Sequence, residues 1–368
     1  MILEEASFQR RLNRFVIEAR LDRKPIRAYL PNPGRLWEFL IPGRIVYLKK
    51  EKREGLPYTV WATERKGSII CLHTQYTNNV AERLIMDGVI EAFRGFTIVK
   101  KEFSINHHRV DFLIKNGRII IPLEVKSCTL FEDTIAMFPD AVTERGRQHL
   151  EVLGRLGGAV LFIVHYPGAE YFLPDFHTDP LFSETLYKLK DKIIIKAISV
   201  MWDKEMNFRF VRELSIPWHI YEKEAGDRGA YIITGLLKRN RTVEIGSLGR
   251  ISFKKGYYLY IGSAMNSLSS RIKRHMRKEK TMRWHIDYLI PYLQDIRAIP
   301  IQSSEDLECH LAQEIESITV DYIKAFGSSD CNCKSHLYWM KDNPFSYQRF
   351  IDILLKYRIG RLMAILGE

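Results

Sequence analysis

Short hydrophobic runs, broken by proline and glycine, open the chain. The runs of strand composition cover 26–29, 44–49 and 58–63. Many short strands separated by turn residues are typical of small β-barrels. The pattern therefore predicts a small β-barrel over residues 1–70.

Helix-like and strand-like stretches alternate in the middle of the chain. Helices are predicted at 78–87 and from within 138–150, and apolar runs at 159–165 and 193–200 fit buried strands. Strands that alternate with helices indicate an α/β sheet. We expect one α/β domain over 71–215, followed by a charged linker at 216–228.

A second alternation follows the predicted linker. It consists of a strand at 229–237, two more strands within 242–262, and helices at 264–278 and 305–318. Leu268, Ile272 and Met276 form the apolar stripe of the first of these helices. The pattern predicts an α/β domain over 229–345 and an amphipathic C-terminal helix at 346–368.

One predicted hairpin carries the most informative side chains. Asn-Gly at 116–117 joins two apolar runs, which predicts a two-residue turn with Asp111 opposite Pro122. Side chains alternate along a strand, so Asp111, Glu124 and Lys126 project from one face. The two carboxylates, about 7 Å apart on a diagonal, could reach one cation. A metal-dependent phosphodiesterase needs this arrangement, whereas the alternative is a surface ion pair.

Charge and cysteine content narrow the class of protein. The chain of 368 residues has 56 Lys and Arg against 44 Asp and Glu, a formal net charge of +12, which favours a polyanionic partner. No run is apolar and long enough to span a bilayer, and five cysteines do not suggest a disulfide framework. We expect a soluble cytoplasmic protein; composition does not exclude RNA as the partner, and homo-oligomerisation is left open.

Residues 1 to about 215 resemble the sugar fermentation stimulation protein A family. The matching motifs are Arg11-Leu-Asn-Arg-Phe15, Leu30-Pro-Asn-Pro-Gly-Arg-Leu36, Arg109-Val-Asp111, Leu123-Glu-Val-Lys126 and Phe138-Pro-Asp140 through His149. The resemblance implies an OB-like barrel followed by a PD-(D/E)xK nuclease-like domain that binds DNA.

The same resemblance supports roles for individual side chains. Asp111, Glu124 and Lys126 would be catalytic, and the two carboxylates with the Val125 carbonyl would hold Mg²⁺ or Mn²⁺. Glu82 could add a ligand through water, or could be a solvated helix residue. Asp140, Gln148 and His149 could line the site, or could cap and face a helix.

Residues 229 to about 345 resemble a GIY-YIG-like domain of unknown function. The resemblance is carried by Gly229-Ala-Tyr231, which departs from GIY at its middle residue, and by Tyr260-Ile-Gly262. It implies Tyr231, Tyr260, Arg271 and Glu308 as catalytic residues, with Arg271 on the phosphate and Glu308 on a cation. Half-buried tyrosines and a solvated arginine are the alternative.

Two further sets of side chains are candidates for binding. The predicted nucleic-acid contacts are Arg11, Arg14, Arg35, Arg145, Arg271, Lys273, Arg274 and His275. For the barrel, aromatic residues in the core and arginines in solvent are an equally open alternative. Cys309, Cys331, Cys333 and His336 could hold a structural Zn²⁺. Their spacing is not a common finger spacing, so ordinary buried cysteines are favoured.

Together these observations predict a multidomain α/β protein in three parts. A small OB-like β-barrel comes first, then a PD-(D/E)xK nuclease-like α/β domain, then a GIY-YIG-like α/β domain. The expected activity is metal-dependent hydrolysis of DNA phosphodiester bonds. The alternative is a non-catalytic DNA-binding regulator built on nuclease-like folds.

Overall fold

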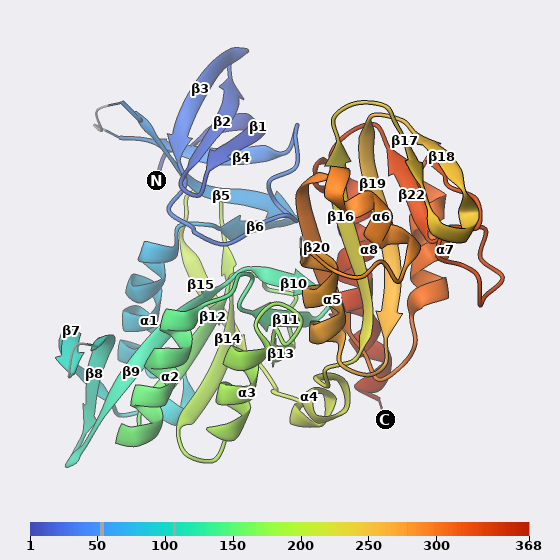
Figure 1. The fold of residues 1–368 in the computed structure, drawn as a ribbon. Helices are drawn as coiled ribbons and strands as arrows, with labels where there is room; N and C mark the ends of the chain where they lie inside the picture. The colour runs from blue at the N-terminus through green and yellow to red at the C-terminus, as the bar shows by residue number, and fades with distance from the viewer. Residues whose placement is uncertain (52–54, 106–107, 278, 368) are drawn as a thin grey trace. The chain divides into compact units, whose positions relative to one another are not determined.

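The chain folds into two compact units in a computed structural model (Figure 1). The structure describes residues 1–51, 55–105, 108–277 and 279–367. The first unit comprises Met1–Tyr221 and the chain from Leu362 onward, and the second comprises Glu222–Arg361.

The first unit begins with an OB-like barrel, as expected. Its strands are β1 (Glu4–Asn13), β2 (Val16–Leu21), β3 (Lys24–Tyr29), β4 (Ile45–Lys50), β5 (Tyr58–Arg65) and β6 (Ser68–Cys71). Strand β1 pairs antiparallel with β2 and with β4, and a parallel pairing of β3 with β5 closes the barrel. The sequence pattern missed β1 and β2. Only alternate residues such as Ala6 and Phe8 are buried in β1, among many charged ones.

A mixed sheet flanked by helices forms the rest of this unit. Its strands run in the order β7 (Thr97–Ile105), β8 (His108–Asn116), β9 (Ile119–Cys128), β12 (Ala159–Val164) and β14 (Ile194–Trp202), with β15 (Phe208–Glu213) beside β14. The helices are α1 (Thr77–Met86), α2 (Glu144–Leu156) and α3 (Pro180–Lys188). A small separate sheet contains β10 (Leu130–Glu132), β11 (Ile135–Phe138) and β13 (Tyr171–Pro174).

Strand β12 is buried on both faces, which explains its uninterrupted apolar run. Val160 and Phe162 belong to the core that also contains Leu150 of α2. Leu161, which points the other way, belongs to the core that contains Val80 of α1. The helices therefore cover opposite faces of the sheet.

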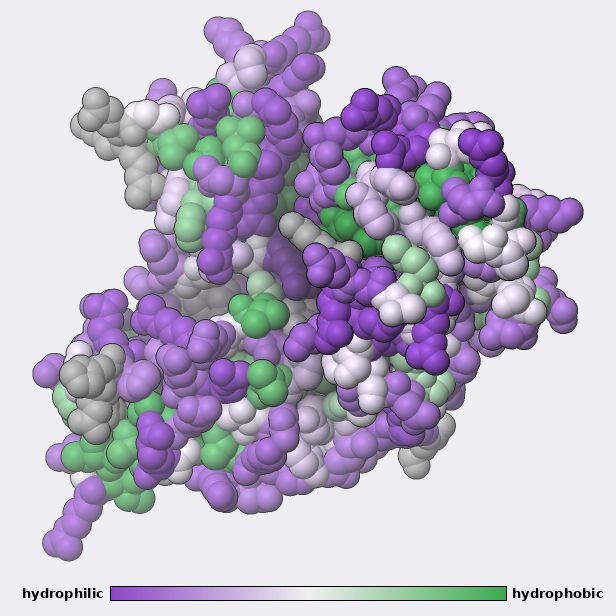
Figure 2. Space-filling model, in the orientation of Figure 1, coloured by the Kyte–Doolittle hydropathy of each residue, from purple (hydrophilic) through white to green (hydrophobic). Residues whose placement is uncertain are grey.

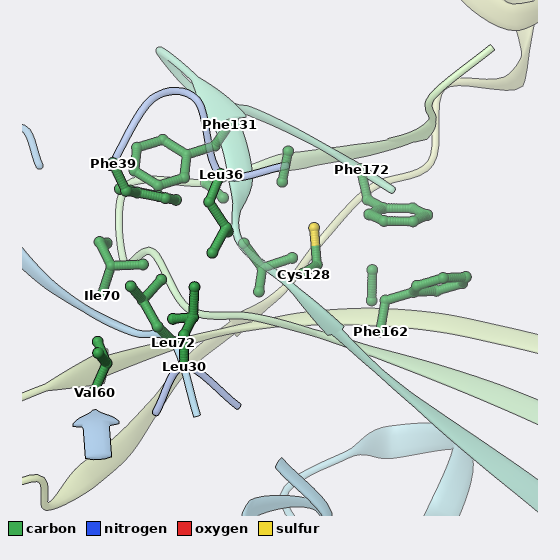
Figure 3. Packing of buried hydrophobic residues seen from close by; sticks show 14 of the residues in the cluster. Leu30, Leu36, Phe39, Val60, Ile70, Leu72, Cys128, Phe131, Phe162 and Phe172 are labelled. Atoms are coloured by element: carbon green, nitrogen blue, oxygen red, sulfur yellow. The ribbon is translucent and has the colours of Figure 1, made fainter. Parts of the chain in front are cut away.

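Barrel and mixed sheet are continuous. Ile69 of β6 pairs with Trp202 of β14, so the strands of both parts form one 12-stranded sheet. The core is shared as well. Figure 3 labels residues from both parts in one cluster: Leu30, Leu36, Phe39, Val60, Ile70 and Leu72 with Cys128, Phe131, Phe162 and Phe172. The expected division between residues 70 and 71 therefore lies inside one compact unit.

The central hairpin has a different register from the predicted one. Asn116 pairs with Ile119, so the turn residues are 117 and 118, one position later than expected. Gly117 takes φ +57, as the first central residue of a type II′ turn requires. Asn116 instead directs its side-chain amide to the carbonyl of Arg94, 3.5 Å away. Extended by one residue, this register sets Asp111 directly opposite Glu124.

The second unit is built on a five-stranded sheet. The order is β20 (Gln294–Gln302), β16 (Gly229–Leu237), β19 (Gly256–Ala264), β22 (Leu337–Met340) and β21 (Asp321–Tyr322), and β17 (Arg241–Glu244) pairs with β18 (Arg250–Phe253). Its helices are α5 (Leu268–Met276), α6 (His285–Leu289), α7 (Glu308–Ile318) and α8 (Gln348–Arg358). Helix α8 is the predicted C-terminal helix, and it contacts α7 and β20.

The predicted linker is partly helical. Helix α4 (Trp218–Glu224) occupies it. Trp218 packs against the first core and Ile220 is fully buried. The charged residues that suggested a linker follow these apolar ones. Short 3₁₀ helices complete the structure: Thr74–Tyr76, Glu91–Phe93, Gly246–Leu248, Ile290–Tyr292, Pro344–Ser346 and Gly360–Ile365.

Hydrophilic residues cover most of the visible face of the molecule, and hydrophobic ones are confined to small patches (Figure 2). Within the described ranges, no helix combines the length and the apolar character that crossing a membrane requires.

Candidate functional sites

A pocket of about 370 Å³ in the first unit brings the predicted hairpin residues together. Asp111 of β8 and Glu124 and Lys126 of β9 line it. Its other walls come from the barrel loop at 32–34, from helix α1 and its preceding turn, and from 138–143.

Two nitrogen donors fix the Asp111 carboxylate. Its Oδ1 accepts a hydrogen bond from Nδ2 of Asn78, and its Oδ2 accepts one from the backbone N–H of Val125, each 2.8 Å long. Asn78 lies on α1, and no pattern in the sequence indicated its role. Asp111 is therefore held from the helix and from the neighbouring strand at once.

Within the described part of the chain, Glu124 is held through one of its two oxygens. Its Oε1 accepts from Nζ of Lys126 at 2.7 Å and lies 2.5 Å from Nδ1 of His149. Nε of Arg145 donates to Nε2 of His149 over 3.4 Å, so Nδ1 is the ring nitrogen that donates to Glu124. His149 is buried on α2, so this helix positions Glu124.

The two carboxylates are close enough to interact electrostatically. Burial raises the pKa of Asp111, and the nearby Glu124 carboxylate raises it further. Burial also acts to raise the pKa of Glu124, but Lys126 and His149 outweigh burial and leave this pKa below its ordinary value. A cation between the carboxylates would relieve their repulsion.

Two buried carboxylate oxygens in this pocket have no hydrogen-bond partner among the described residues. They are Oε2 of Glu124 and Oδ2 of Asp140. Asp140 packs so closely against the barrel loop that a Cβ on Gly34 would overlap its Oδ2. Buried acceptors are almost always satisfied, so free oxygens of this kind fit a site for a cation.

A buried histidine, His165, contacts Ser127 and Thr77, two residues that line the pocket. Nε1 of Trp202 donates to Nδ1 of His165 at 3.0 Å, so the neutral ring carries its proton on Nε2. Nε2 lies 3.0 Å from Oγ of Ser127 and 3.3 Å from Oγ1 of Thr77. Burial lowers the pKa of His165 to about 3, so the ring is neutral at physiological pH. Sequence reasoning missed this network because its members are far apart in the chain.

The structure does not bring Glu82 to this pocket. Glu82 pairs with Nζ of Lys101 at 2.6 Å and lines a separate groove with Met86 and Phe96. One turn earlier on the same helix, Asn78 faces Asp111 instead. The prediction of Glu82 as a water-mediated ligand is therefore not supported.

The predicted nucleic-acid contacts of the first unit differ in their surroundings. Arg11 is not free to bind phosphate, because its guanidinium donates to the backbone carbonyls of Asn13, Arg14, Asn32, Gly34 and Arg35. Arg14 is exposed and lines the pocket. Arg35 lies over the ring of Trp37, 5.0 Å from its centroid.

A second pocket, of about 420 Å³, lies in the second unit. All four predicted residues line it: Tyr231 of β16, Tyr260 of β19, Arg271 of α5 and Glu308 of α7. Tyr231 pairs with Gly262, where a Cβ would overlap the tyrosine hydroxyl oxygen, so glycine is required there. The two tyrosine rings share a face of the sheet, with centroids 6.3 Å apart.

Tyr231 continues into a buried chain of hydrogen bonds. Its hydroxyl lies 2.9 Å from Nε2 of His275, whose Nδ1 lies 3.2 Å from Oδ1 of Asp287. Arg274 and the backbone N–H groups of residues 283 and 284 also donate to Asp287. Burial acts to raise the pKa of Asp287, but these donors lower it overall. If His275 is neutral, Nδ1–H faces the carboxylate and Nε2 accepts from Tyr231.

Two predictions for helix α5 are wrong. His275 is fully buried and therefore does not contact DNA. Met276, expected in the apolar stripe, is 40% exposed instead. Arg274 is engaged with Asp287 and Trp284, whereas Lys273 is exposed. Histidine is a hydrophilic residue, so the sequence did not indicate that His275 is buried.

Glu308 connects the second pocket to a cluster of sulfur and nitrogen atoms. Its Oε2 accepts from Oγ of Ser263 at 2.6 Å, and its Oε1 lies 3.0 Å from Nδ1 of His336. Cys309, Cys331, Cys333 and His336 form the cluster, with ligand atoms within 4.8 Å of one another.

Comparisons with known proteins agree with both resemblances. Residues 10–72 match the SfsA N-terminal OB domain, and residues 75–206 match the sugar fermentation stimulation protein RE domain. A sugar fermentation stimulation protein homolog of Methanothermobacter thermautotrophicus is 37% identical over 231 residues, which are 59% of this chain and 96% of the relative. This chain belongs to the sugar fermentation stimulation protein family.

Other relatives match about half of the chain. The homolog of Methanosphaera stadtmanae is 40% identical over 190 residues, 48% of this chain and 78% of the relative. The solved structure of Pyrococcus furiosus SfsA in complex with Ca²⁺ is 30% identical, with a TM-score of 0.55 over 58% of this chain and 96% of that chain. Residues 230–358 match a different model, the domain of unknown function DUF123.

Proposed function

We propose that this protein is a metal-dependent nuclease that hydrolyses DNA phosphodiester bonds, with Asp111, Glu124 and Lys126 as its principal catalytic residues. The observation that carries the proposal is Oε2 of Glu124, a buried oxygen without a hydrogen-bond partner among the described residues, in a pocket shared with Asp111. An acceptor in this state fits a cation as its missing partner.

Asp111, Glu124 and the Val125 carbonyl would hold Mg²⁺ or Mn²⁺, which prefer oxygen ligands. Pyrococcus furiosus SfsA was solved in complex with Ca²⁺, a cation with the same ligand preference, and this supports the assignment. When bound, the cation would supply Lewis-acid chemistry that stabilises charge on a scissile phosphate.

Lys126 is placed to orient the reacting groups. Its ammonium lies 2.7 Å from Oε1 of Glu124 and is mostly buried, with 14% of its side chain exposed. It could donate to a water molecule or to a phosphate oxygen entering the pocket. Exposed Arg14 at the rim would attract the DNA backbone, since phosphate contacts from basic side chains dominate affinity for DNA.

The second pocket supports a separate role in binding phosphate. Arg271 has the planar guanidinium that suits phosphate geometry, and its guanidinium carbon lies 4.4 Å from the ring centroid of Trp284. Tyr231, Tyr260 and Glu308 complete a nuclease-like set there. Loss of Arg271 therefore tests whether this pocket binds DNA, independently of the first.

The decisive experiment is DNA cleavage by the full-length protein in Mg²⁺ or Mn²⁺ and in chelator. Supercoiled, linear and single-stranded DNA would each be tried. Asp111→Ala and Lys126→Ala should each abolish metal-stimulated cleavage while DNA binding remains. Glu82→Gln is the matched control, because Glu82 is an acidic residue of a neighbouring groove, and it should cleave normally.

Three results would decide between the alternatives. Undiminished cleavage by Asp111→Ala and Lys126→Ala would reject the first pocket as the active site. Cleavage that is lost in Arg271→Ala but kept in those variants would assign it to the second pocket. DNA binding that persists in chelator, without metal-stimulated cleavage of any substrate, would favour a non-catalytic DNA-binding regulator.

A further inference from the structure

Three cysteines and one histidine of the second unit converge from two separate segments. Cys309 lies in the first turn of α7, whereas Cys331, Cys333 and His336 lie between β21 and β22. Their ligand atoms lie within 4.8 Å of one another, and the imidazole of His336 is buried. All four side chains can therefore approach a single point.

We propose that this cluster, Cys309, Cys331, Cys333 and His336, binds a structural Zn²⁺ ion. Three thiolates and one imidazole are a common tetrahedral zinc set. With Zn–S bonds of about 2.3 Å and a Zn–N bond of about 2.0 Å, a tetrahedral site separates sulfur from nitrogen by about 3.5 Å. Sγ of Cys331 lies 3.5 Å from Nε2 of His336. On binding, each cysteine would release its thiol proton to solvent, and His336 would bind as the neutral ring.

Glu308 supplies the outer contact that a zinc-bound histidine requires. Zinc-bound histidines almost always direct their second nitrogen to a carboxylate, a carbonyl or a water. Nδ1 of His336 lies 3.0 Å from Oε1 of Glu308, but this buried nitrogen makes no hydrogen bond among the described residues. Nε2 faces the cysteine sulfur, so Glu308 is the carboxylate close enough to accept from Nδ1–H once Nε2 binds the metal.

Zinc would also fix the wall of the second pocket. Every residue of 323–336 is described, and none of them belongs to a helix or strand. Gly327, Ser329 and Asp330 in this segment line the second pocket, immediately before Cys331. A zinc ion that joins this segment to α7 would hold the pocket wall and Glu308 in place. The inference does not depend on the proposed nuclease activity.

Metal analysis of the full-length protein, purified in reductant and dialysed against Zn²⁺ and then metal-free buffer, tests the proposal. We expect one zinc ion per chain and, after replacement by Co²⁺, thiolate-to-metal charge-transfer absorption. His336→Asn and Cys333→Ser should lose the metal. His310→Asn should keep it, because His310 follows Cys309 but is exposed and lies outside the cluster.

Folded protein that contains no zinc after this treatment would overturn the proposal, as would a disulfide within the cluster in the same sample. Equal zinc content of His336→Asn and His310→Asn would also overturn it. Glu308→Gln should keep zinc but bind it about 10- to 100-fold more weakly in competition with a chelator. Unchanged affinity would overturn the assignment of Glu308 as the outer contact.

Discussion

Nδ1 of His149 lies 2.5 Å from Oε1 of Glu124 and joins helix α2 to strand β9. This contact occupies one oxygen of the carboxylate and leaves Oε2 without a partner among the described residues. His149 does not need to touch DNA to matter, because it sets the direction in which Glu124 presents its free oxygen. We therefore regard it as a positioning residue.

Replacement of His149 should mainly weaken the binding of the metal ion in the first pocket. In His149→Ala, the Mn²⁺ concentration for half-maximal cleavage should rise about 10- to 100-fold, as for other outer contacts of metal ligands. His149→Gln, which can still donate to Glu124, should recover part of the loss. Glu151→Gln, on the same helix with a half-exposed side chain, is the control and should resemble the wild type. A normal Mn²⁺ dependence of His149→Ala would contradict the positioning role.

Divalent cations should stabilise the folded protein through the first pocket. A ligand that binds only the native state at 100 times its dissociation constant adds about 2.7 kcal/mol to the free energy of unfolding. We expect Ca²⁺ to raise the melting temperature of the wild type and of Glu82→Gln, but not that of Glu124→Gln. Differential scanning calorimetry in chelator and in Ca²⁺ measures this difference. An equal shift in Glu124→Gln would place the cation elsewhere.

Gly262→Ala should damage the second pocket by displacing Tyr231. The new methyl group would overlap the tyrosine hydroxyl oxygen, so the ring must move away from His275. Overpacking of this kind costs about 1–3 kcal/mol. Urea unfolding and DNA affinity together measure the effect. In Gly226→Ala the Cβ would meet only the side chain of Arg228, no closer than 3.4 Å, so this control should be nearly neutral.

Acid should destabilise the first unit through His165. The folded pKa of about 3 lies below the ordinary value of 6.5, so the unfolded chain binds a proton that the folded one does not. The contribution of neutral His165 to the free energy of unfolding is present above about pH 6.5 and is lost as the pH falls. The free energy of unfolding should decrease by about 2 kcal/mol between pH 7 and pH 5. Urea unfolding at both pH values should give a smaller loss for His165→Gln than for the wild type. The exposed-histidine control, His219→Gln, should retain the full loss; equal losses in all three proteins would exclude His165 as the cause.

Local patterns predicted much of this molecule. The barrel, the α/β order of both units and the family were confirmed, because alternation and motif residues are properties of short segments. Asp111, Glu124 and Lys126 were also placed on one face. The observed pairing of β8 with β9 differs from the predicted one by two residues. A shift of two residues leaves each side chain on the same face, so the predicted placement was correct although the predicted turn was not.

Contacts between distant segments could not be predicted in the same way. Asn78 reaches Asp111 across 33 positions, and His165 reaches Ser127 across 38. Arg11 was predicted to contact DNA because it is basic, but its guanidinium donates to backbone carbonyls of the barrel loop. Charge in a sequence shows what a side chain could bind, whereas burial and partners decide what remains available.

The pairing of Ile69 with Trp202 limits where the protein can be truncated without disrupting its core. A fragment that ends after the barrel would leave β6 as an unpaired edge and would expose the apolar surface that Leu36 and Phe39 share with Phe131. We therefore expect a cut between the barrel and the α/β part to give two fragments with exposed apolar surface. The continuous stretch that keeps this pairing and the shared core together is Met1–Tyr221, so a truncation should preserve all of it.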